Sequence, residues 1–345
     1  MRVLFASAHK YLPELRGGME INTHQLAVRL SGIGFPIGVL AGLMGQGITG
    51  VRAKLQMSIF RRSMSVDKTL GYPVWRAHDS TTVAKDVAIA FQPDIVVVQG
   101  GLNFMTLVHS FRRLGLPVIG YLHSADRLPL DSVLQMDHRL AFVANSRFTA
   151  SLHPEKRIIA ILPPIVPREL YTIESDRSSA IFINPTSYKG LSVVLNLAHA
   201  RPDVPFIFVA NSVSGRIAYR APANVTLLGP LADMRRVYRR ARLILAPSQC
   251  EETWGRIVSE AHVSGIPVLT SSGGGLPESV GPGGICLPAD SSASNWESAF
   301  AEIWDSHANY KELCTSALEF SYRREIDPDY LIKTLVGVLE NQMRT

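Results

Sequence analysis

The stretch that decides the fold, residues 246–288, reads APSQCEETWGRIVSEAHVSGIPVLTSSGGGLPESVGPGGICLP. Its pattern predicts a strand, a loop, a helix, a second strand and a glycine-rich loop, in that order. Two carboxylates, Glu252 and Glu260, stand eight positions apart across the expected start of the helix. Eight helical residues rise about 12 Å, so this spacing fits the two ends of one extended ligand.

The start of a helix presents unpaired N–H groups and the positive end of the helix dipole, which together suit a diphosphate. A carboxylate would repel phosphate, but it accepts hydrogen bonds from the hydroxyls of a sugar or a ribose. Acids on either side of such a helix start therefore predict a nucleotide-sugar site. A solvated surface helix would explain either glutamate alone, so the prediction depends on the whole stretch.

The same stretch resembles the signature of the retaining glycosyltransferases of family 4, which have the GT-B fold. That signature is E-G-F-G-x-x-x-x-E-A, followed by G-x-P-V and a G-G-x-x-E loop. Thr253 stands where the family has glycine. The matching residues are Glu252, Trp254, Gly255, Glu260, Ala261, Gly265, Pro267, Val268, Gly274, Gly275 and Glu278.

The resemblance implies an α/β protein with two Rossmann-like, doubly wound parallel-sheet domains that face each other across a cleft. It also implies an enzyme that moves a sugar from a nucleoside-diphosphate sugar to a glycan, lipid-linked or small-molecule acceptor. Two alternatives stay open at this point. One is a nucleotide-sugar epimerase of the same fold, and the other is a non-catalytic nucleotide-sugar binding protein.

The resemblance also assigns roles to individual residues. Glu252, His123 and Lys189 are the catalytic candidates: Glu252 orients the transferred sugar, His123 lies near it, and Lys189 stabilises the departing diphosphate. Lys189-Gly190 matches a Lys-Gly of the family, whereas the arginine that precedes it in the family is replaced by I-N-P at 183–185. The remaining donor-binding candidates are Gly17, Gly18, Asn184, Trp254, Gly255, Arg256, Ile257 and Glu260, with Glu260 on the ribose.

No metal or other cofactor is expected, because GT-B enzymes usually need none for the chemistry. The string Asp327-Pro328-Asp329 is interpreted as the acidic start of the last helix and not as a metal site. The three cysteines, Cys250, Cys286 and Cys314, have no C-x-x-C spacing and are expected to be reduced thiols.

Short apolar runs such as 95–98 and 206–209 predict strands buried on both faces of parallel sheets, and helical patterns at 20–30 and 191–200 lie between such runs. A proline cluster at 163–167 marks a domain boundary. We therefore expect an N-terminal domain at 1–165 and a donor-binding domain at 166–327. By resemblance, a last helix at about 328–345 packs back on the first domain.

The chain has 345 residues, of which 46% are hydrophobic, and a net charge of +6. The positive charge favours acidic partners, but no nucleic-acid module is present. Residues 52–68 combine basic side chains with the apolar Leu55, Met57, Ile59 and Phe60. This pattern fits either an ordinary solvated surface or contact with a membrane surface. A second basic cluster at 235–242 is interpreted as a solvated helix face.

No apolar run is long enough to span a bilayer, and the run Val3–Ala8 is too short for a signal peptide. We therefore expect a cytoplasmic protein, which would lie against the inner membrane face if residues 52–68 bind lipid. The sequence does not indicate the oligomeric state, the acceptor, or the sugar and base of the donor.

Overall fold

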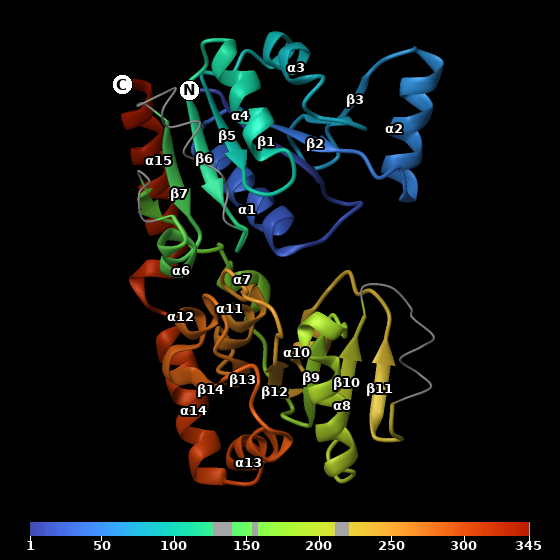
Figure 1. The fold of residues 1–345 in the computed structure, drawn as a ribbon, viewed down its shortest axis with the longest axis vertical. Coiled ribbons are helices and arrows are strands. Elements are labelled where there is room, and N and C mark those ends of the chain that lie inside the picture. The colour runs from blue at the N-terminus through green and yellow to red at the C-terminus, as the bar shows by residue number, and fades with distance from the viewer. Residues whose placement is uncertain (127–139, 154–157, 211–220, 345) are drawn as a thin grey trace. The chain divides into compact units, whose positions relative to one another are not determined.

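The computed structural model describes residues 1–126, 140–153, 158–210 and 221–344 (Figure 1). The chain forms two compact units. Unit 1 consists of Met1–Ile165 together with Asp327–Thr345, and unit 2 consists of Val166–Ile326. Each unit is built on one sheet with helices packed against it (Figure 1).

The sheet of unit 1 has eight strands in the order β3-β4-β2-β1-β5-β6-β7-β8. Every neighbouring pair is parallel except β3 and β4, which are antiparallel. The central strands carry continuous apolar sequence because helices cover both of their faces. The strands are β1 (Val3–Lys10), β2 (Ile37–Gly42), β3 (Met64–Asp67), β4 (Val74–Ala77), β5 (Ile95–Gln99), β6 (Val118–Leu122), β7 (Ala141–Ala144) and β8 (Ile158–Ile161).

The helices of unit 1 include the C-terminal helix α15 (Pro328–Arg344). Leu331, Leu335 and Leu339 of α15 are spaced four apart and are buried in one apolar cluster with Leu26 and Leu30 of α1. The Asp327 carboxylate accepts the Tyr330 N–H at 2.8 Å, which confirms that the acidic string begins a helix. The other helices are α1 (Gly18–Gly32), α2 (Gly47–Ile59), α3 (Ala84–Phe91), α4 (Phe104–Arg113) and α6 (Arg147–Ser151).

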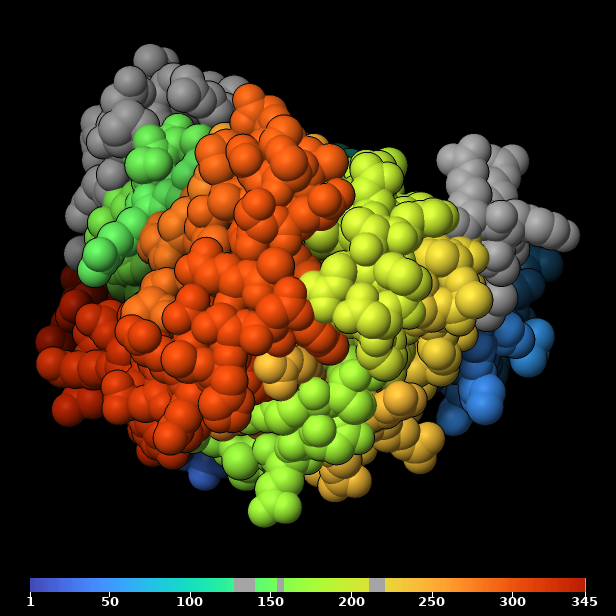
Figure 2. All heavy atoms as spheres, turned by 90° about the horizontal axis from the view of Figure 1, so that it is seen from below, coloured from blue at the N-terminus to red at the C-terminus, as the bar shows by residue number. Residues whose placement is uncertain are grey.

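The sheet of unit 2 has six parallel strands in the order β11-β10-β9-β12-β13-β14. These strands are β9 (Ser179–Ile183), β10 (Phe206–Val209), β11 (Val225–Leu228), β12 (Ala241–Ala246), β13 (Val268–Ser271) and β14 (Gly284–Leu287). The helices are α7 (Arg168–Tyr171), α8 (Leu191–Ala200), α10 (Arg235–Tyr238), α11 (Arg256–His262), α12 (Leu276–Val280), α13 (Ala293–Trp304) and α14 (His307–Phe320). Figure 2 shows α13 and α14, in orange to red, gathered beside α8 in yellow-green, and all three pack on one apolar cluster of the unit.

Both sheets reverse their direction of growth at one point. In unit 2 the chain runs outward from β9 to β11 and then crosses to the other side of β9 to form β12. In unit 1 the same reversal separates β1 from β5. At such a switch point the loops after the two neighbouring strands leave in opposite directions, which opens the carboxyl edge of the sheet to a ligand.

The predicted fold class is confirmed, with two corrections of detail. Unit 1 is not wholly parallel, since β3 pairs antiparallel with β4. The basic stretch 52–68 is not one element either, because α2 ends at Ile59 and β3 begins at Met64. Met57, which was grouped with the apolar residues of that stretch, is buried against Leu43 and Ala53. None of the helices in the described parts of the chain has the length and apolar character needed to cross a membrane.

Candidate active site

A lysine and a glutamate meet at the switch point of unit 2. Lys189 ends the short 3-10 turn that follows β9, and Glu252 lies in the loop that follows β12. The Lys189 Nζ is 2.8 Å from Glu252 Oε1, and the Ser248 hydroxyl donates a hydrogen bond to the same oxygen. The two charged side chains are 25% and 15% exposed, so solvent and a ligand can still reach them.

The two loops are held together by their backbones. Gly190 has a φ of +85°, and a Cβ at this position would overlap the Pro247 carbonyl oxygen. The Gln249 N–H donates to the Tyr188 carbonyl at 2.8 Å. Only glycine allows this approach at this backbone angle, so the Lys-Gly pair seen in the sequence is a requirement of the loop packing. The backbones that carry the cation and the acid are thereby held together.

The glycine-rich loop supports Glu252 from the other side. Glu252 forms an isolated parallel bridge with Gly274. The Gly275 N–H donates to the Glu252 carbonyl at 2.6 Å. The G-G-G stretch that the sequence singled out therefore positions the backbone of the loop after β12, and with it the carboxylate.

Gly255 begins helix α11 with a φ of +77°, and a Cβ here would overlap the Leu276 side chain. Gly255 offers no side-chain cap, and Arg256 and Ile257 supply the first N–H groups of the helix. The Ile257 side chain packs, partly buried, against the core of the unit. The backbone and not the side chain of Ile257 is thus the part suited to a ligand.

Trp254 packs inside unit 2. Its side chain is 4% exposed, and its indole N–H donates to the Ser259 hydroxyl at 3.0 Å. The Arg323 guanidinium lies 5.7 Å from the ring centre. As a donor-binding candidate, Trp254 can therefore act through its backbone, while its ring holds the start of α11 in place.

Glu260 is buried, and each of its carboxylate oxygens accepts a hydrogen bond from a neighbouring side chain. Its Oε1 accepts from Arg256 Nε at 2.7 Å, and its Oε2 accepts from the Tyr238 hydroxyl at 2.6 Å. Arg256 also donates to the Tyr171 hydroxyl at 3.3 Å. Burial, together with the charge of Glu260, raises the pKa of Tyr171 and Tyr238, so both phenols stay protonated. The ribose role of Glu260 stays a prediction, since these bonds occupy one lone pair on each oxygen and leave others.

Asn184 directly follows β9 and has a φ of +59°, a conformation that asparagine tolerates better than most residues. Its amide donates to the Tyr188 hydroxyl at 3.3 Å, and its N–H donates to the Val209 carbonyl at 2.8 Å. The structure therefore assigns Asn184 to the turn that carries Lys189.

The other candidates, His123, Gly17 and Gly18, belong to unit 1. His123 Nε2 is 2.6 Å from Gln99 Oε1, while Gln99 Nε2 donates to the Thr23 hydroxyl at 2.8 Å and that hydroxyl donates to the Met19 carbonyl. Because the amide oxygen of Gln99 can only accept, His123 Nε2 carries the proton. Burial and the nearby His9 lower the pKa of His123 to about 3, so the ring is neutral at pH 7.

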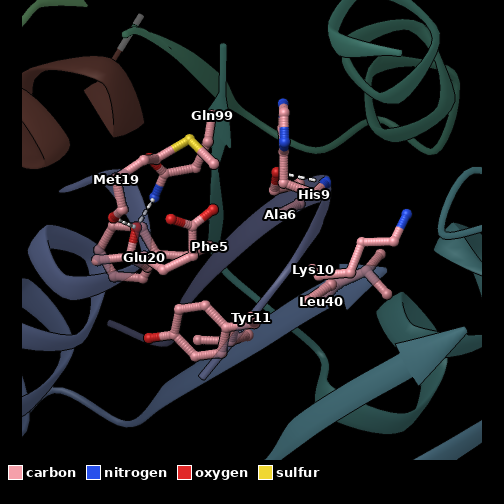
Figure 3. Close-up of a pocket in the computed structure, with 13 residues that line it drawn as sticks. Phe5, Ala6, His9, Lys10, Tyr11, Met19, Glu20, Leu40 and Gln99 are labelled. Atoms are coloured by element: carbon pink, nitrogen blue, oxygen red, sulfur yellow. Dashed lines mark hydrogen bonds between the residues drawn. The ribbon is translucent and has the colours of Figure 1, made fainter. Parts of the chain in front are cut away.

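A small hollow lies beside the switch point of unit 1, lined by β1, β2, the start of α1 and Gln99 at the end of β5 (Figure 3). Glu20 points into it and also accepts hydrogen bonds from the N–H groups of Gly17 and Glu20. Gly17 is the N-cap of α1, so Glu20 closes this helix start in the manner of a capping box. Burial raises the pKa of Glu20 to about 6.

Several contributing residues could not be singled out by the motif alone. Gln99 carries no motif, and Ser248 belongs to the A-P-S string but was given no role; only the folded sheets bring them to His123 and Glu252. The Arg256–Glu260 pair, four apart on a helix, was visible as an i,i+4 spacing. The G-x-x-E spacing from Gly17 to Glu20 was likewise visible as a capping signal. In the described residues, no group of three or more His, Cys, Asp or Glu side chains is arranged to hold a metal ion.

Comparison with solved structures identifies the fold. A glycosyltransferase from Rickettsia africae superimposes with a TM-score of 0.76 at 13% identity, covering 100% of this chain and 99% of that one. The Anabaena protein Alr3699/HepE, solved in complex with UDP-glucose, gives a TM-score of 0.75 at 17% identity, covering 99% and 100%. The fold is therefore that of the GT-B glycosyltransferases.

Sequence comparison matches one segment of the chain to a family. Residues 189–306 match the family model of the Glycosyl transferases group 1, a segment that runs from Lys189 through Glu252 and Glu260. The D-inositol 3-phosphate glycosyltransferase of Mycobacterium sp. (strain KMS) is 36% identical over 110 residues, which cover 28% of this chain and 24% of the relative. The chain thus matches about a quarter of the length of that curated relative. The predicted resemblance to this group of glycosyltransferases is confirmed for residues 189–306.

Proposed function

We propose that the protein is a retaining glycosyltransferase that transfers a sugar from a nucleoside-diphosphate sugar to an acceptor. The observation that carries this proposal is the Lys189–Glu252 pair at the β9/β12 switch point, 2.8 Å apart and partly exposed. A cation for a phosphate and an acid for a hydroxyl stand there side by side, at the sheet edge where ligands of this topology bind.

The diphosphate is assigned to the space between the Lys189 ammonium and the start of α11. A lysine binds phosphate as a point charge, and the N–H groups of Arg256 and Ile257 add the positive end of the helix. The Anabaena protein of the same fold was solved with UDP-glucose, which supports a nucleotide sugar as the co-substrate here. The acceptor remains open.

Glu252 is assigned to the transferred sugar. The Lys189 and Ser248 contacts are both made by its Oε1, and the proposal gives its Oε2 to a sugar hydroxyl. The ion pair keeps the carboxylate oriented before the donor arrives. When a diphosphate binds, Lys189 shares its charge between the acid and the phosphate.

Glu260 is assigned to the ribose hydroxyls. Arg256 and Tyr238 hold the carboxylate in one orientation, at 2.7 and 2.6 Å. A carboxylate has about four acceptor sites, so the ribose can bond without displacing either neighbour. In this assignment Arg256 and Tyr238 orient the Glu260 carboxylate toward the ribose.

Negative charge develops on the diphosphate as the bond to the anomeric carbon breaks. Lys189 and the α11 N–H groups stabilise this charge more in the transition state than in the ground state. The acceptor hydroxyl attacks on the face from which the diphosphate leaves and passes its proton to the departing diphosphate oxygen, so the anomeric configuration is retained without a covalent enzyme intermediate. In this scheme Lys189 and the helix start supply the positive field, and turnover is expected to persist in EDTA.

The test is an assay of the purified protein with UDP, GDP, ADP and dTDP sugars, with and without candidate acceptors. Transfer, or slow hydrolysis that releases the nucleoside diphosphate, supports the proposal. Interconversion of the sugar without release points to an epimerase, and binding without turnover points to a non-catalytic binding protein. NMR of the product then reports its anomeric configuration, and a sugar adduct trapped on Glu252 would contradict front-face attack.

A further inference from the structure

Helix α2 of unit 1 presents an apolar stripe to solvent. Ile48, Val51, Leu55 and Ile59 are spaced three or four apart, so they share one face of the helix. Ile48 is 91% exposed, Leu55 57% and Ile59 64%, and Phe60 at the end of the helix is 63% exposed. Isolated exposed apolar residues are common in proteins, but a continuous stripe along a helix indicates an interaction surface.

The stripe is distinct from the face that holds α2 on the unit. Gly50, Ala53 and Met57 are the buried residues of the helix, and the last two pack with Leu43. At 100° per residue these positions lie roughly 170° from the exposed stripe. The helix therefore has a second apolar face that its own unit leaves uncovered. Figure 1 shows α2 at the margin of unit 1, beyond β3.

The surroundings of the stripe are uniformly basic. Arg52, Lys54, Arg61 and Arg62 are exposed, and the sequence contains no acidic residue between Glu20 and Asp67. The Arg62 guanidinium lies 5.5 Å from the centre of the Phe60 ring, so a cation and an aromatic side chain share the end of the helix. Apolar side chains flanked by Lys and Arg, with aromatic residues among them, are the composition of helices that lie in a membrane interface.

The start of α2 is firmly attached to unit 1. Glu14 Oε1 accepts the N–H groups of Gly45 and Gln46 at 2.6 and 3.1 Å. Its other oxygen lies 3.5 Å from an Arg76 guanidinium nitrogen, and both side chains are fully buried. Glu14 belongs to the loop between β1 and α1 that leads to Gly17. Docking of α2 on a surface would therefore also hold the loop between β1 and α1.

We propose that α2 docks this protein on an anionic lipid bilayer, with Ile48, Leu55, Ile59 and Phe60 entering the interface and Arg52, Arg61 and Arg62 meeting lipid phosphates. Charge complementarity selects this occupant. A second copy of the chain placed on α2 by two-fold symmetry would set this basic surface against an equally basic one. A polyanion without an apolar part would leave the stripe in water.

Vesicle flotation tests the proposal. The full chain is mixed with vesicles of phosphatidylcholine that contain 30 to 40 per cent, roughly, of phosphatidylglycerol, and with vesicles of phosphatidylcholine alone. We expect flotation with the anionic vesicles, weakened by salt, and little with the neutral ones. The triple variant Ile48→Ser, Leu55→Ser, Ile59→Ser should lower the partition coefficient by about a hundredfold. Arg61→Gln with Arg62→Gln should lower it by about fivefold for each arginine.

Matched control variants separate docking through α2 from nonspecific binding to vesicles. Ile89→Ser removes a 65% exposed apolar residue from α3, and Arg236→Gln with Arg239→Gln removes exposed cations from the second basic cluster. Both should float like the wild type, and thermal melts check that every variant is folded. Equal flotation on neutral vesicles, or flotation that the α2 variants leave unchanged, overturns the proposal. So does a dimer in sedimentation velocity that the serine variant dissociates, because the stripe would then bind a second copy.

Discussion

The two units use the same strand order around their switch points but provide different chemistry there. In unit 2 the β9/β12 edge presents a partly exposed Lys189–Glu252 pair and a helix start whose N-cap is glycine. In unit 1 the β1/β5 edge presents the neutral His123 and Gln99, and the start of α1 is closed by Glu20. Our proposal places an anion at the first helix start, whereas a carboxylate of the chain already occupies the second.

This difference shows that the topology provides a place for a ligand and that a few side chains decide its charge. Both edges have a glycine just before the helix, Gly17 in unit 1 and Gly255 in unit 2. The glycine alone therefore does not define an anion site. The position of the nearest acid does, because Glu20 folds back on its own helix start while Glu252 is held by Lys189 and Ser248.

The largest effect is expected from Lys189→Met, which removes the cation from the unit 2 edge. Loss of a group that stabilises the leaving diphosphate should lower kcat/KM by about 100- to 1000-fold. Steady-state kinetics with the best donor measure it. Lys311→Met, at an exposed lysine on α14, is the matched control and should leave the rate unchanged. Normal turnover of the Lys189→Met enzyme would contradict the assignment of Lys189 to the diphosphate at the unit 2 edge.

Substitutions of Gly190 in unit 2 and Gly17 in unit 1 compare the two edges through the free energy of unfolding. Gly190→Ala places a Cβ against the Pro247 carbonyl at a φ of +85°, so it should lower the free energy of unfolding by about 2–4 kcal/mol. Gly17→Ala meets only the carboxylate end of the Glu20 side chain, at a φ of −97°, and should cost about 1 kcal/mol through the cap. Urea unfolding of both variants measures the difference. Equal losses would mean that the Lys189 turn is not held against the β12 loop as described.

Glu252→Gln keeps the shape of the side chain and removes its charge. It should lower kcat by about ten- to a hundredfold, since the sugar loses an oriented acceptor, yet nucleotide affinity should change little because Lys189 remains. Kinetics together with calorimetric titration of the nucleoside diphosphate separate the two quantities. Glu251→Gln, at the exposed neighbouring residue, is the control. If Glu252→Gln loses nucleotide affinity and keeps kcat, its assignment to the sugar is wrong.

The smallest effect concerns Glu20 and depends on pH. Its pKa is raised from 4.5 to about 6, so the folded protein holds a proton there that the unfolded chain releases. The contribution of Glu20 to stability is therefore fully present below pH 4.5 and is lost as the pH rises to about 6, by about 2 kcal/mol at most. The unfolding free energy of wild type minus that of Glu20→Gln, measured from pH 4 to 7, should fall over this window. A flat or rising difference would contradict the buried capping carboxylate.

Sequence patterns predicted the helices and strands well where the apolar runs were continuous. The run 206–209 and the helix 191–200 have the bounds of β10 and α8. The short strand β3, with the sequence Met-Ser-Val-Asp, was missed because four alternating residues do not distinguish a strand from a loop. Its pairing with β4 is antiparallel and depends on contacts that the local sequence does not encode.

The candidate site was predicted as residue types and not as contacts. The motif indicated that Lys189 and Glu252 act on one ligand, but they are 63 positions apart, and only the β9–β12 pairing brings them to 2.8 Å. Tyr238 and Glu260 are likewise joined by the fold alone. The Glu20 cap can be predicted from the local sequence, because it depends on a three-residue spacing at a helix start.

The most direct test of the central claim, that a diphosphate binds at the β9/β12 edge, uses Cys250 as a reporter. Cys250 is exposed and lies two residues before Glu252, whereas Cys286 and Cys314 are partly buried and burial raises the pKa of both thiols. Mass spectrometry follows the alkylation of each cysteine with and without the nucleoside diphosphate whose sugar supports turnover. We predict that this nucleotide slows the alkylation of Cys250 in a saturable way and that the corresponding nucleoside does not. An unchanged rate at Cys250 under saturating nucleotide would contradict the account.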